Sequence, residues 1–491
     1  MFRSIYMKWE KFYKRFHILL LSFVSSIMLL ILSPNILRIL IGWDGLGVRS
    51  YLLVIYYNSP KSYNSGIITF MSNRIGDALI IGSLAFFIMY PSLNLTTMRN
   101  FLSLNPLIFL AIIIASFTKR AQLPFRAWLP AAIAAPTPVS SLVHSSTLVT
   151  AGVYLIFRLK GSITKIHIDH LMIIFGTITI IIARIAAFSE TDMKKIVALS
   201  TLRQLGVIIT AIGVGFKILA FFHLIAHAFF KALLFIRAGK LIHASERYQD
   251  MRFMGGSSSE IIPLTTSVVL SASMSLCGLP FMSAFYSKEM VIELMLIKLV
   301  PLYSYLLMML GIAMTLFYRI RFLIYAATLY ERQQSTFSKN DTGLRYNSRI
   351  VFLFVPAVTG GSILNDSLGP NIMILIDTKV KIFTLTVILL TIAAFKIRIY
   401  SYQKKSVLLL WLSGSLWILP YFTARLPNKI FINLGDYLIK VSDFAWLSYR
   451  FLIFRTSFTK LSPTTGFSFQ KITFIRLILY SFTVLILFFL F

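Results

Sequence analysis

The chain has little of what a soluble redox enzyme or a disulfide-linked domain requires. Its 491 residues include one cysteine, Cys277, which excludes a disulfide framework and any iron–sulfur or zinc site that takes several cysteines from this chain. It has neither a GxGxxG loop for a dinucleotide nor a GxxxxGK[ST] loop for a nucleotide phosphate. Charged residues make up 13% of the chain, about half the share of a typical soluble domain. We therefore expect that this chain binds no cofactor and that any redox chemistry happens elsewhere.

Apolar residues dominate what is present. Hydrophobic residues make up 57% of the chain, and the mean hydropathy is +0.80. Runs long enough to cross about 30 Å of hydrocarbon recur along the chain, and we count about thirteen to fifteen of them. The sequence predicts a multi-pass membrane protein with spans at 17–33, 36–57, 67–91, 105–119, 132–158, 168–188, 194–214, 217–238, 260–278, 297–327, 347–364, 378–397, 405–422 and 473–491.

The formal charge of +31 would suggest a nucleic-acid partner in a soluble protein. In a membrane protein, Lys and Arg are enriched in the loops on one side of the bilayer, so a positive balance is expected there without such a partner. We predict that the partner of these positive charges is the lipid bilayer and that the chain binds no nucleic acid.

A weak internal repeat bears on the predicted fold. Leu123-Pro124-Phe125 follows Lys119, and Leu279-Pro280-Phe281 precedes Lys288. Interrupted hydrophobic segments in corresponding places are typical of inverted repeats with a polar site at mid-membrane, although so short a string also recurs by chance. We predict an all-α transmembrane bundle with two inverted five-helix repeats that contain broken helices.

The C-terminal part has a different pattern. Five polar residues fall at helical spacing on one side of the segment 428–455: Asn433, Asp436, Lys440, Asp443 and Arg450. Such an amphipathic lateral helix either lies on the lipid surface or straps neighbouring subunits together. The predicted organisation is an N-terminal segment at 1–16, inverted-repeat half-channels at 17–160 and 161–327, further spans at 328–427, the lateral helix with a linker at 428–472, and an anchoring span at 473–491.

Ionisable residues inside apolar runs are the first candidates for function, because a charge at mid-membrane costs roughly 2.5–3.5 kcal/mol even on a lenient scale. Asp44 lies in GWDGLG, Lys119 lies in FTKRAQLPF, and His144 follows the prolines at 136 and 138. The distance between a lysine and a carboxylate decides how firmly each holds its proton, so a moving Asp44–Lys119 pair can load and release one. The alternatives are a static ion pair or helix cap for Asp44 and a hydrogen-bonded interior side chain for His144.

A second group of ionisable residues follows further along the chain. The motif HLIAHAFFK places His223, His227 and Lys231 at four-residue steps, about 6 Å apart on one helix face, which suits a proton relay through water. Zinc is the competing interpretation, but the motif lacks the glutamate of HExxH and a third ligand. Lys288 and Glu289 in FYSKEM form the last station. Supporting charges, which are equally suited to capping helix ends, are Arg74, Asp77, Asp192 and Lys194.

Six motifs together resemble the antiporter-like membrane subunits of respiratory NADH:quinone oxidoreductase: GWDGLG, SNRIGD, TKRAQLPFRAWLPAAIAAPTPVSSLVHSSTLVTAGVYL, KKIVALSTLRQLG, HLIAHAFFKALLF and GLPFMSAFYSKEM. The resemblance is strong from about residue 33 to 289 and weaker beyond. It implies that Asp44 is the pumping carboxylate, Lys119 its paired lysine and His144 the connecting histidine. It also implies a central relay of His223, His227 and Lys231 and an exit-side lysine at Lys288.

The resemblance further implies a subunit of the proton-translocating complex in the mitochondrial inner membrane, with no redox centre of its own. NADH, FMN, iron–sulfur clusters and ubiquinone would be bound elsewhere in that complex. Its partners would be other membrane-arm subunits and lipid, cardiolipin above all. The same core motifs also fit a multi-subunit cation/proton antiporter of the sodium type, and a non-pumping structural subunit is a third alternative.

The chain departs from the family pattern in three ways. It has Asp44 where many members have glutamate, and it begins just before the family's fourth span, so that about three spans are expected to precede it. Arginine stands at five places where relatives tend to have serine or another small or apolar residue: Arg49, Arg120, Arg126, Arg203 and Arg237. Invertebrate mitochondria commonly translate AGA and AGG as serine, so we predict that serine occupies these positions in the protein.

Overall fold

A computed structural model of the chain describes residues 6–7, 10–87, 94, 106–165, 168–244, 248–253, 263–298, 300–325, 344–368, 378–400, 426–450 and 452–453. These residues form two compact units, one within residues 1–423 and the other within 424–491. The predicted spans 405–422 and 473–491 lie outside the described residues.

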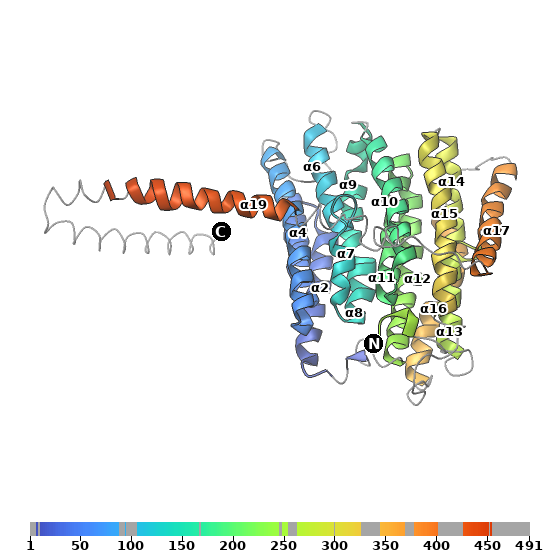
Figure 1. Cartoon of the computed structure of the whole chain (residues 1–491). Coiled ribbons are helices and arrows are strands. Elements are labelled where there is room, and N and C mark those ends of the chain that lie inside the picture. The colour runs from blue at the N-terminus through green and yellow to red at the C-terminus, as the bar shows by residue number, and fades with distance from the viewer. Residues whose placement is uncertain are drawn as a thin grey trace. The chain divides into compact units, whose positions relative to one another are not determined.

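Unit 1 is a bundle of helices that stand side by side with roughly parallel axes (Figure 1). Within the described ranges, nine helical segments are long and apolar enough to cross a membrane. They are Tyr13–Leu32 (α2), Ile36–Tyr57 (α3 Ile36–Val54 with its terminal turn Ile55–Tyr57), Pro60–Phe87 (α4), Thr137–Gly161, Asp169–Ser189 (α10), Met193–Val214 (α11), Lys217–His243 (within α12, Lys217–Ala244), Leu302–Leu323 (α15) and Val351–Leu368 (within α16, Leu344–Leu368). The multi-pass helical fold is therefore confirmed.

The stretch between α6 and α9 is built from several short helices. Helix α6 (Pro106–Arg120) ends one residue after Lys119, and Trp128–Ala131 (α7), Ala132–Ala134 (η2) and Thr137–Val139 (α8) follow it. A π-helix, Ser140–Thr147 (η3), then leads directly into Leu148–Lys165 (α9). The prolines in this stretch lack the backbone N–H that a continuous α-helix needs, which explains why the predicted span 132–158 is divided here.

The structure also contains a helix that the predicted list of spans omits. Pro263–Cys277 (α13) is followed by Ser283–Ile297 (α14), and the predicted span 297–327 corresponds to α15, which begins at Leu302. Helix α14 has only 15 residues and carries Lys288, Glu289 and Glu293. Its short and charged sequence gives no long apolar run, so hydropathy alone does not reveal it.

Helix α11 is the centre of unit 1, since its whole apolar window is buried. It packs on α10 at very close range, because a Cβ added to Gly206 would lie 2.9 Å from the Gly176 carbonyl oxygen. Arg321, in the last turn of α15, donates to the backbone carbonyls of Phe188 and Glu190 at the end of α10. Carbonyls at a helix C-terminus lack intrahelical partners, so this arginine caps α10 and ties α15 to it.

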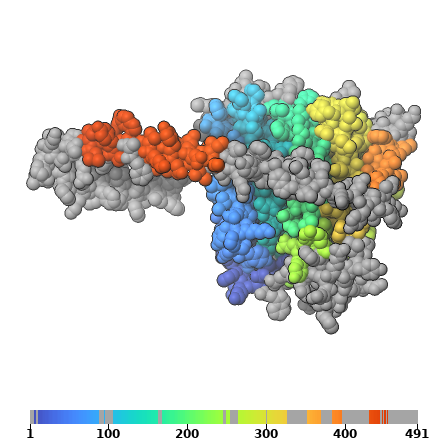
Figure 2. Space-filling model, in the orientation of Figure 1, coloured from blue at the N-terminus to red at the C-terminus, as the bar shows by residue number. Residues whose placement is uncertain are grey.

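Apolar side chains also cover the outside of the bundle, as a lipid-facing surface requires. Helix α4, blue in Figure 2, presents exposed Ile67, Met71, Ile75 and Ile81. Helix Thr378–Tyr400 (α17), which contains the short apolar stretch Ile382–Ala394, presents exposed Leu389 and Leu390.

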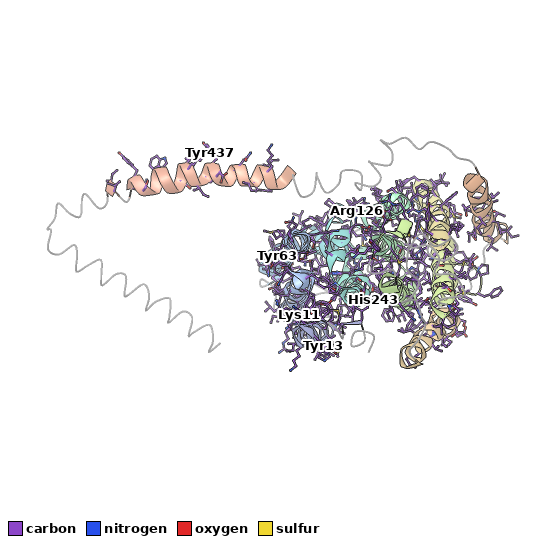
Figure 3. The ribbon with its side chains drawn as sticks, turned by 60° about the horizontal axis from the view of Figure 1, so that its bottom comes forward. Lys11, Tyr13, Tyr63, Arg126, His243 and Tyr437 are labelled. Carbon is purple, nitrogen blue, oxygen red and sulfur yellow. The ribbon has the colours of Figure 1, made fainter. Side chains whose placement is uncertain are left out.

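Unit 2 is helical over much of the segment in which an amphipathic helix is predicted. Leu426–Leu438 (α19) continues into the π-helix Ile439–Leu447 (η7), and Tyr437 is labelled on α19 in Figure 3. Phe431, Leu434, Tyr437 and Trp446 are all more than half exposed. The helix therefore offers a long apolar surface, as predicted for the segment 428–455.

Candidate functional site

Asp44 on α3 forms an ion pair with an arginine on the next helix. Its carboxylate lies 2.9 Å from the Arg74 guanidinium of α4, and the same guanidinium lies 3.3 Å from the carboxylate of Asp77, one turn further along α4. The Asp44 and Arg74 side chains are 41% and 40% exposed, whereas that of Asp77 is 8% exposed. One arginine thus holds two carboxylates, one at the surface of the unit and one inside it.

Lys119 is completely buried in the last turn of α6. Its ammonium donates to the backbone carbonyl of Trp43 and lies 4.1 Å from the centroid of the Trp43 indole ring. Sequence reasoning predicted Asp44 as the partner of Lys119. The structure instead places the ammonium on the residue before Asp44, while Arg74 holds the carboxylate.

Close helix packing brings α4 to Lys119. A Cβ added to Gly76 would lie 2.3 Å from the Oγ1 atom of Thr118, the residue before the lysine. Only glycine permits this approach, which sets Asp77 of α4 against the end of α6. The site therefore depends on the glycine that precedes the carboxylate.

His144 is 2% exposed within the π-helix η3. Its ring lies edge-on to that of Trp128, with 6.2 Å between the ring centroids, and the Trp128 indole N–H donates to the Thr118 carbonyl at 2.8 Å. Among the described residues neither ring nitrogen of His144 has a hydrogen-bond partner. Trp128 thus links the lysine end of α6 to a histidine whose nitrogens can exchange protons.

His223 of α12 joins two other helices. Its Nε2 atom lies 3.1 Å from the Gln204 Oε1 atom of α11, and its Nδ1 atom lies 2.8 Å from the Ser287 hydroxyl of α14. A carbonyl oxygen only accepts, so Nε2 donates to Gln204 and Nδ1 is left to accept from Ser287. Because Ser287 precedes Lys288, this hydrogen bond joins His223 to the residue next to that lysine.

His227 and Lys231 follow on the same helix and are buried as well. The Lys231 ammonium donates to the Ser200 hydroxyl of α11 and, at 3.2 Å, to the Val197 carbonyl. The Arg319 guanidinium of α15 donates to the same hydroxyl at 2.7 Å. Two cations therefore donate to one neutral oxygen.

Lys288 lies at the junction of α13 and α14. Its ammonium donates to the Leu276 carbonyl in the last turn of α13, where the helix dipole is negative. Lys288 and Glu289 line a cavity of about 30 Å³ together with Gly278 and, from α17, Thr384. That volume is enough for one or two water molecules.

Asp192 and Lys194 lie at the start of α11, away from these contacts. Asp192 pairs with Lys195 at 3.1 Å, Glu190 lies 3.6 Å from the same ammonium, and Lys194 is 5% exposed. Burial raises the pKa of the Glu190 carboxyl, which lies in the turn between α10 and α11. The backbone of this turn pairs with residues 249–251, so these charges fasten a helix end.

Three polar partners of the site were missed by sequence reasoning: Gln204, Ser200 and Ser287. Serine and glutamine are common in membrane helices, so only their contacts distinguish them. In the part of the chain that the structure describes, no group of three or more His, Cys, Asp or Glu residues could hold a metal ion.

Comparison with known proteins decides the family. Residues 33–318 match the family model described as NADH:quinone oxidoreductase/Mrp antiporter, TM, and residues 318–491 match NADH dehydrogenase subunit 5 C-terminus. This chain belongs to the NADH-ubiquinone oxidoreductase chain 5 family. The chain 5 of Locusta migratoria is 38% identical over 99% of this chain and 87% of its own length, and that of Aedes aegypti is 41% identical over 89% and 77%.

Two solved structures share the fold. One chain of the Mrp complex from a Dietzia species matches with a TM-score of 0.69 at 24% identity, over 90% of this chain and 51% of that chain. The membrane-bound sulfane sulfur reductase, an archaeal respiratory membrane complex, gives a TM-score of 0.64 at 18% identity, over 73% of this chain and 75% of the matched one. This chain therefore spans about half the length of the Mrp chain.

Several arginines are buried inside the bundle. Arg120, Arg126, Arg203 and Arg237 are each 1% exposed or less, and Arg126 is labelled in Figure 3. Within the described residues, all three guanidinium nitrogens of Arg120 lack a hydrogen-bond partner. Arg184, which the family pattern did not single out, is 1% exposed, and among the described residues its three guanidinium nitrogens also lack a hydrogen-bond partner.

We predict that Gly278→Ala disturbs the position of Lys288. Gly278 has a φ of +82°, and a Cβ there would lie 3.3 Å from the Lys288 Cδ and 3.4 Å from its Nζ. An alanine would be strained in this left-handed conformation and would crowd the Lys288 ammonium, so the substitution should destabilise the fold by about 1–2 kcal/mol. Thermal unfolding of the purified complex measures the loss. Gly82→Ala on α4 is the control, since a Cβ there meets nothing within 4 Å, and an equal loss in both variants would contradict the prediction.

Proposed function

We propose that this chain is a membrane-arm subunit of NADH:ubiquinone oxidoreductase that moves protons across the mitochondrial inner membrane. Electron transfer from NADH to ubiquinone in other subunits, which hold FMN and the iron–sulfur clusters, would drive the movement. The observation that supports this most is a series of buried ionisable side chains within an apolar bundle, on several of the helices from α4 to α14. Such residues are costly in a membrane and are otherwise rare.

The contacts suggest an order for the transfer. Asp44 and Asp77 face Lys119 from α3 and α4, and Trp128 connects the end of α6 to His144. His223 then bridges to Ser287 beside Lys288. Imidazole can carry a proton on either nitrogen, so a His223 ring that is protonated on Nδ1 donates to the Ser287 hydroxyl instead of accepting from it, which directs a proton toward Lys288. In this scheme Lys288 and Glu289 deliver the proton to their cavity.

We further propose that the bundle consists of two inverted repeats with broken helices. Lys119 lies at the end of α6, before the irregular residues 121–127, and Lys288 binds a carbonyl at the end of α13, before the irregular residues 278–282. Positive φ angles occur in both, at Ala121 and Phe281. The similar position of a lysine at each interruption supports the repeat. Neighbouring membrane-arm subunits, and cardiolipin around the bundle, are the partners we propose.

The proposed function predicts that His223→Phe uncouples electron transfer from pumping. The ring change removes both hydrogen bonds of the histidine, so protons moved per NADH oxidised should fall about tenfold. The measurement is the change in pH inside sealed vesicles that contain the purified complex, while a short-chain ubiquinone oxidises NADH. His243→Phe is the matched control, because His243 is an exposed histidine at the end of the same helix and is labelled in Figure 3.

The same vesicles test the alternatives. If proton movement requires sodium and continues without NADH oxidation, the chain acts as a cation/proton antiporter. If His223→Phe and the wild type pump equally, the ionisable residues of this chain carry no protons and the subunit is structural.

A further inference from the structure

Trp43 contacts the Lys119 ammonium in two ways. Its backbone carbonyl accepts a hydrogen bond from the ammonium, and its indole ring lies 4.1 Å away, measured to the ring centroid. Both residues are 0% exposed. A cation over an aromatic face is attracted to the negative face of the ring, most strongly by tryptophan and most strongly where water is excluded. The indole therefore stabilises a charged lysine without itself taking a proton.

The carboxylates near this lysine are held by another cation. Arg74 lies 2.9 Å from Asp44 and 3.3 Å from Asp77, so the guanidinium competes with Lys119 for the same two acceptors. A lysine bound to a carboxylate holds its proton more firmly than one bound to neutral groups. We call the arrangement in the structure open, because Asp44 is paired with Arg74 and the Lys119 ammonium lies on Trp43 rather than on a carboxylate.

Trp43 and Asp44 are adjacent on α3, so the residue that the lysine contacts in the structure lies next to the carboxylate that the sequence predicts as its partner. A small movement of the lysine side chain, together with release of Asp44 by Arg74, would exchange the indole for the carboxylate. A long, flexible lysine side chain can make such a movement without any shift of the helices.

We propose that Trp43 is a positioning residue, which holds the Lys119 ammonium in the open arrangement and sets how easily it moves to Asp44. The inference rests on the proposed proton-pumping function and adds a residue to it. Trp43 acts through Lys119 and does not carry the proton.

Two variants of Trp43 in the purified complex test this inference. Trp43→Leu removes the aromatic face, and Trp43→Phe keeps a weaker one. We expect protons moved per NADH to fall about fivefold in the leucine variant and to stay within about twofold of wild type in the phenylalanine variant. Phe23→Leu, a fully buried aromatic on α2, is the control for a packing defect and should pump as the wild type does.

Three results would overturn the inference: normal pumping in Trp43→Leu, an equal loss in the phenylalanine and leucine variants, or an equal loss in Phe23→Leu. If Trp43→Leu fails to assemble, Trp43→Met, which fills irregular space flexibly, replaces it in the comparison. The proposed function is tested separately by His223→Phe. If that variant loses pumping while Trp43→Leu retains it, only the role of Trp43 is wrong.

Discussion

Lys119→Met is expected to stop proton translocation while leaving the complex assembled. The ammonium is fully buried at the end of α6, where it donates to the Trp43 carbonyl, and methionine fills a similar volume without a proton to give. Removing a proton-transferring group costs about 100-fold or more. The measurement is the initial rate of proton movement in sealed vesicles, compared with the rate of NADH oxidation in the presence of an uncoupler.

Lys119→Arg separates charge from proton transfer. Arginine retains a cation at the site but does not release its proton, so we expect the same loss as for methionine. Lys61→Met, at the exposed start of α4, removes a lysine from the surface and should pump normally. Pumping in the arginine variant would show that Lys119 acts only through its charge, and the relay that begins there would be wrong.

Peptide mass spectrometry of the isolated subunit is expected to find serine at the buried arginine positions. Arg120 and Arg184 have no hydrogen-bond partner for any guanidinium nitrogen among the described residues, and Arg203 has none for two of its three. A buried cation left without compensation costs roughly 3–5 kcal/mol, and several such costs would approach the stability of a whole domain. A serine hydroxyl can donate a hydrogen bond to the backbone carbonyl one helical turn earlier, as Ser200 does to Val197.

Partnered arginines are the internal control for this measurement. Arg74 pairs with Asp44, Arg252 pairs with Asp250 at 2.6 Å, and Arg321 caps α10, so each should be found as arginine. The hydrogen bond from Arg252 holds the pKa of the Asp250 carboxyl below its ordinary value, as a true ion pair would. Arginine in the peptides that contain positions 120, 184 and 203 would contradict the prediction. Serine there would reduce the positive charge of the chain and remove two of the cations near Lys288, Arg184 and Arg203.

The interpretation of the sequence succeeded wherever a single helix carries the signal. Apolar runs of sufficient length predicted α10, α11 and α15 to within a few residues, because in a membrane every backbone N–H must be satisfied inside its own segment. It failed at α14, whose run is short and contains Lys288 and Glu289. The division of 132–158 into several helices was foreseen only as a proline break.

What the sequence by itself determined is the class of the molecule and its ionisable residues. Composition requires a membrane bundle, and the cost of burying Lys119, His223 or Lys288 marks them as candidates for function whatever their surroundings. Only the tertiary structure decided their partners. Asp44 pairs with Arg74 on the next helix, whereas Lys119 rests on Trp43 and His223 reaches Ser287 across helices that are distant in sequence. Helical spacing fixes which side chains share a face of one helix, but contacts between helices depend on how close glycines such as Gly76 let the backbones approach.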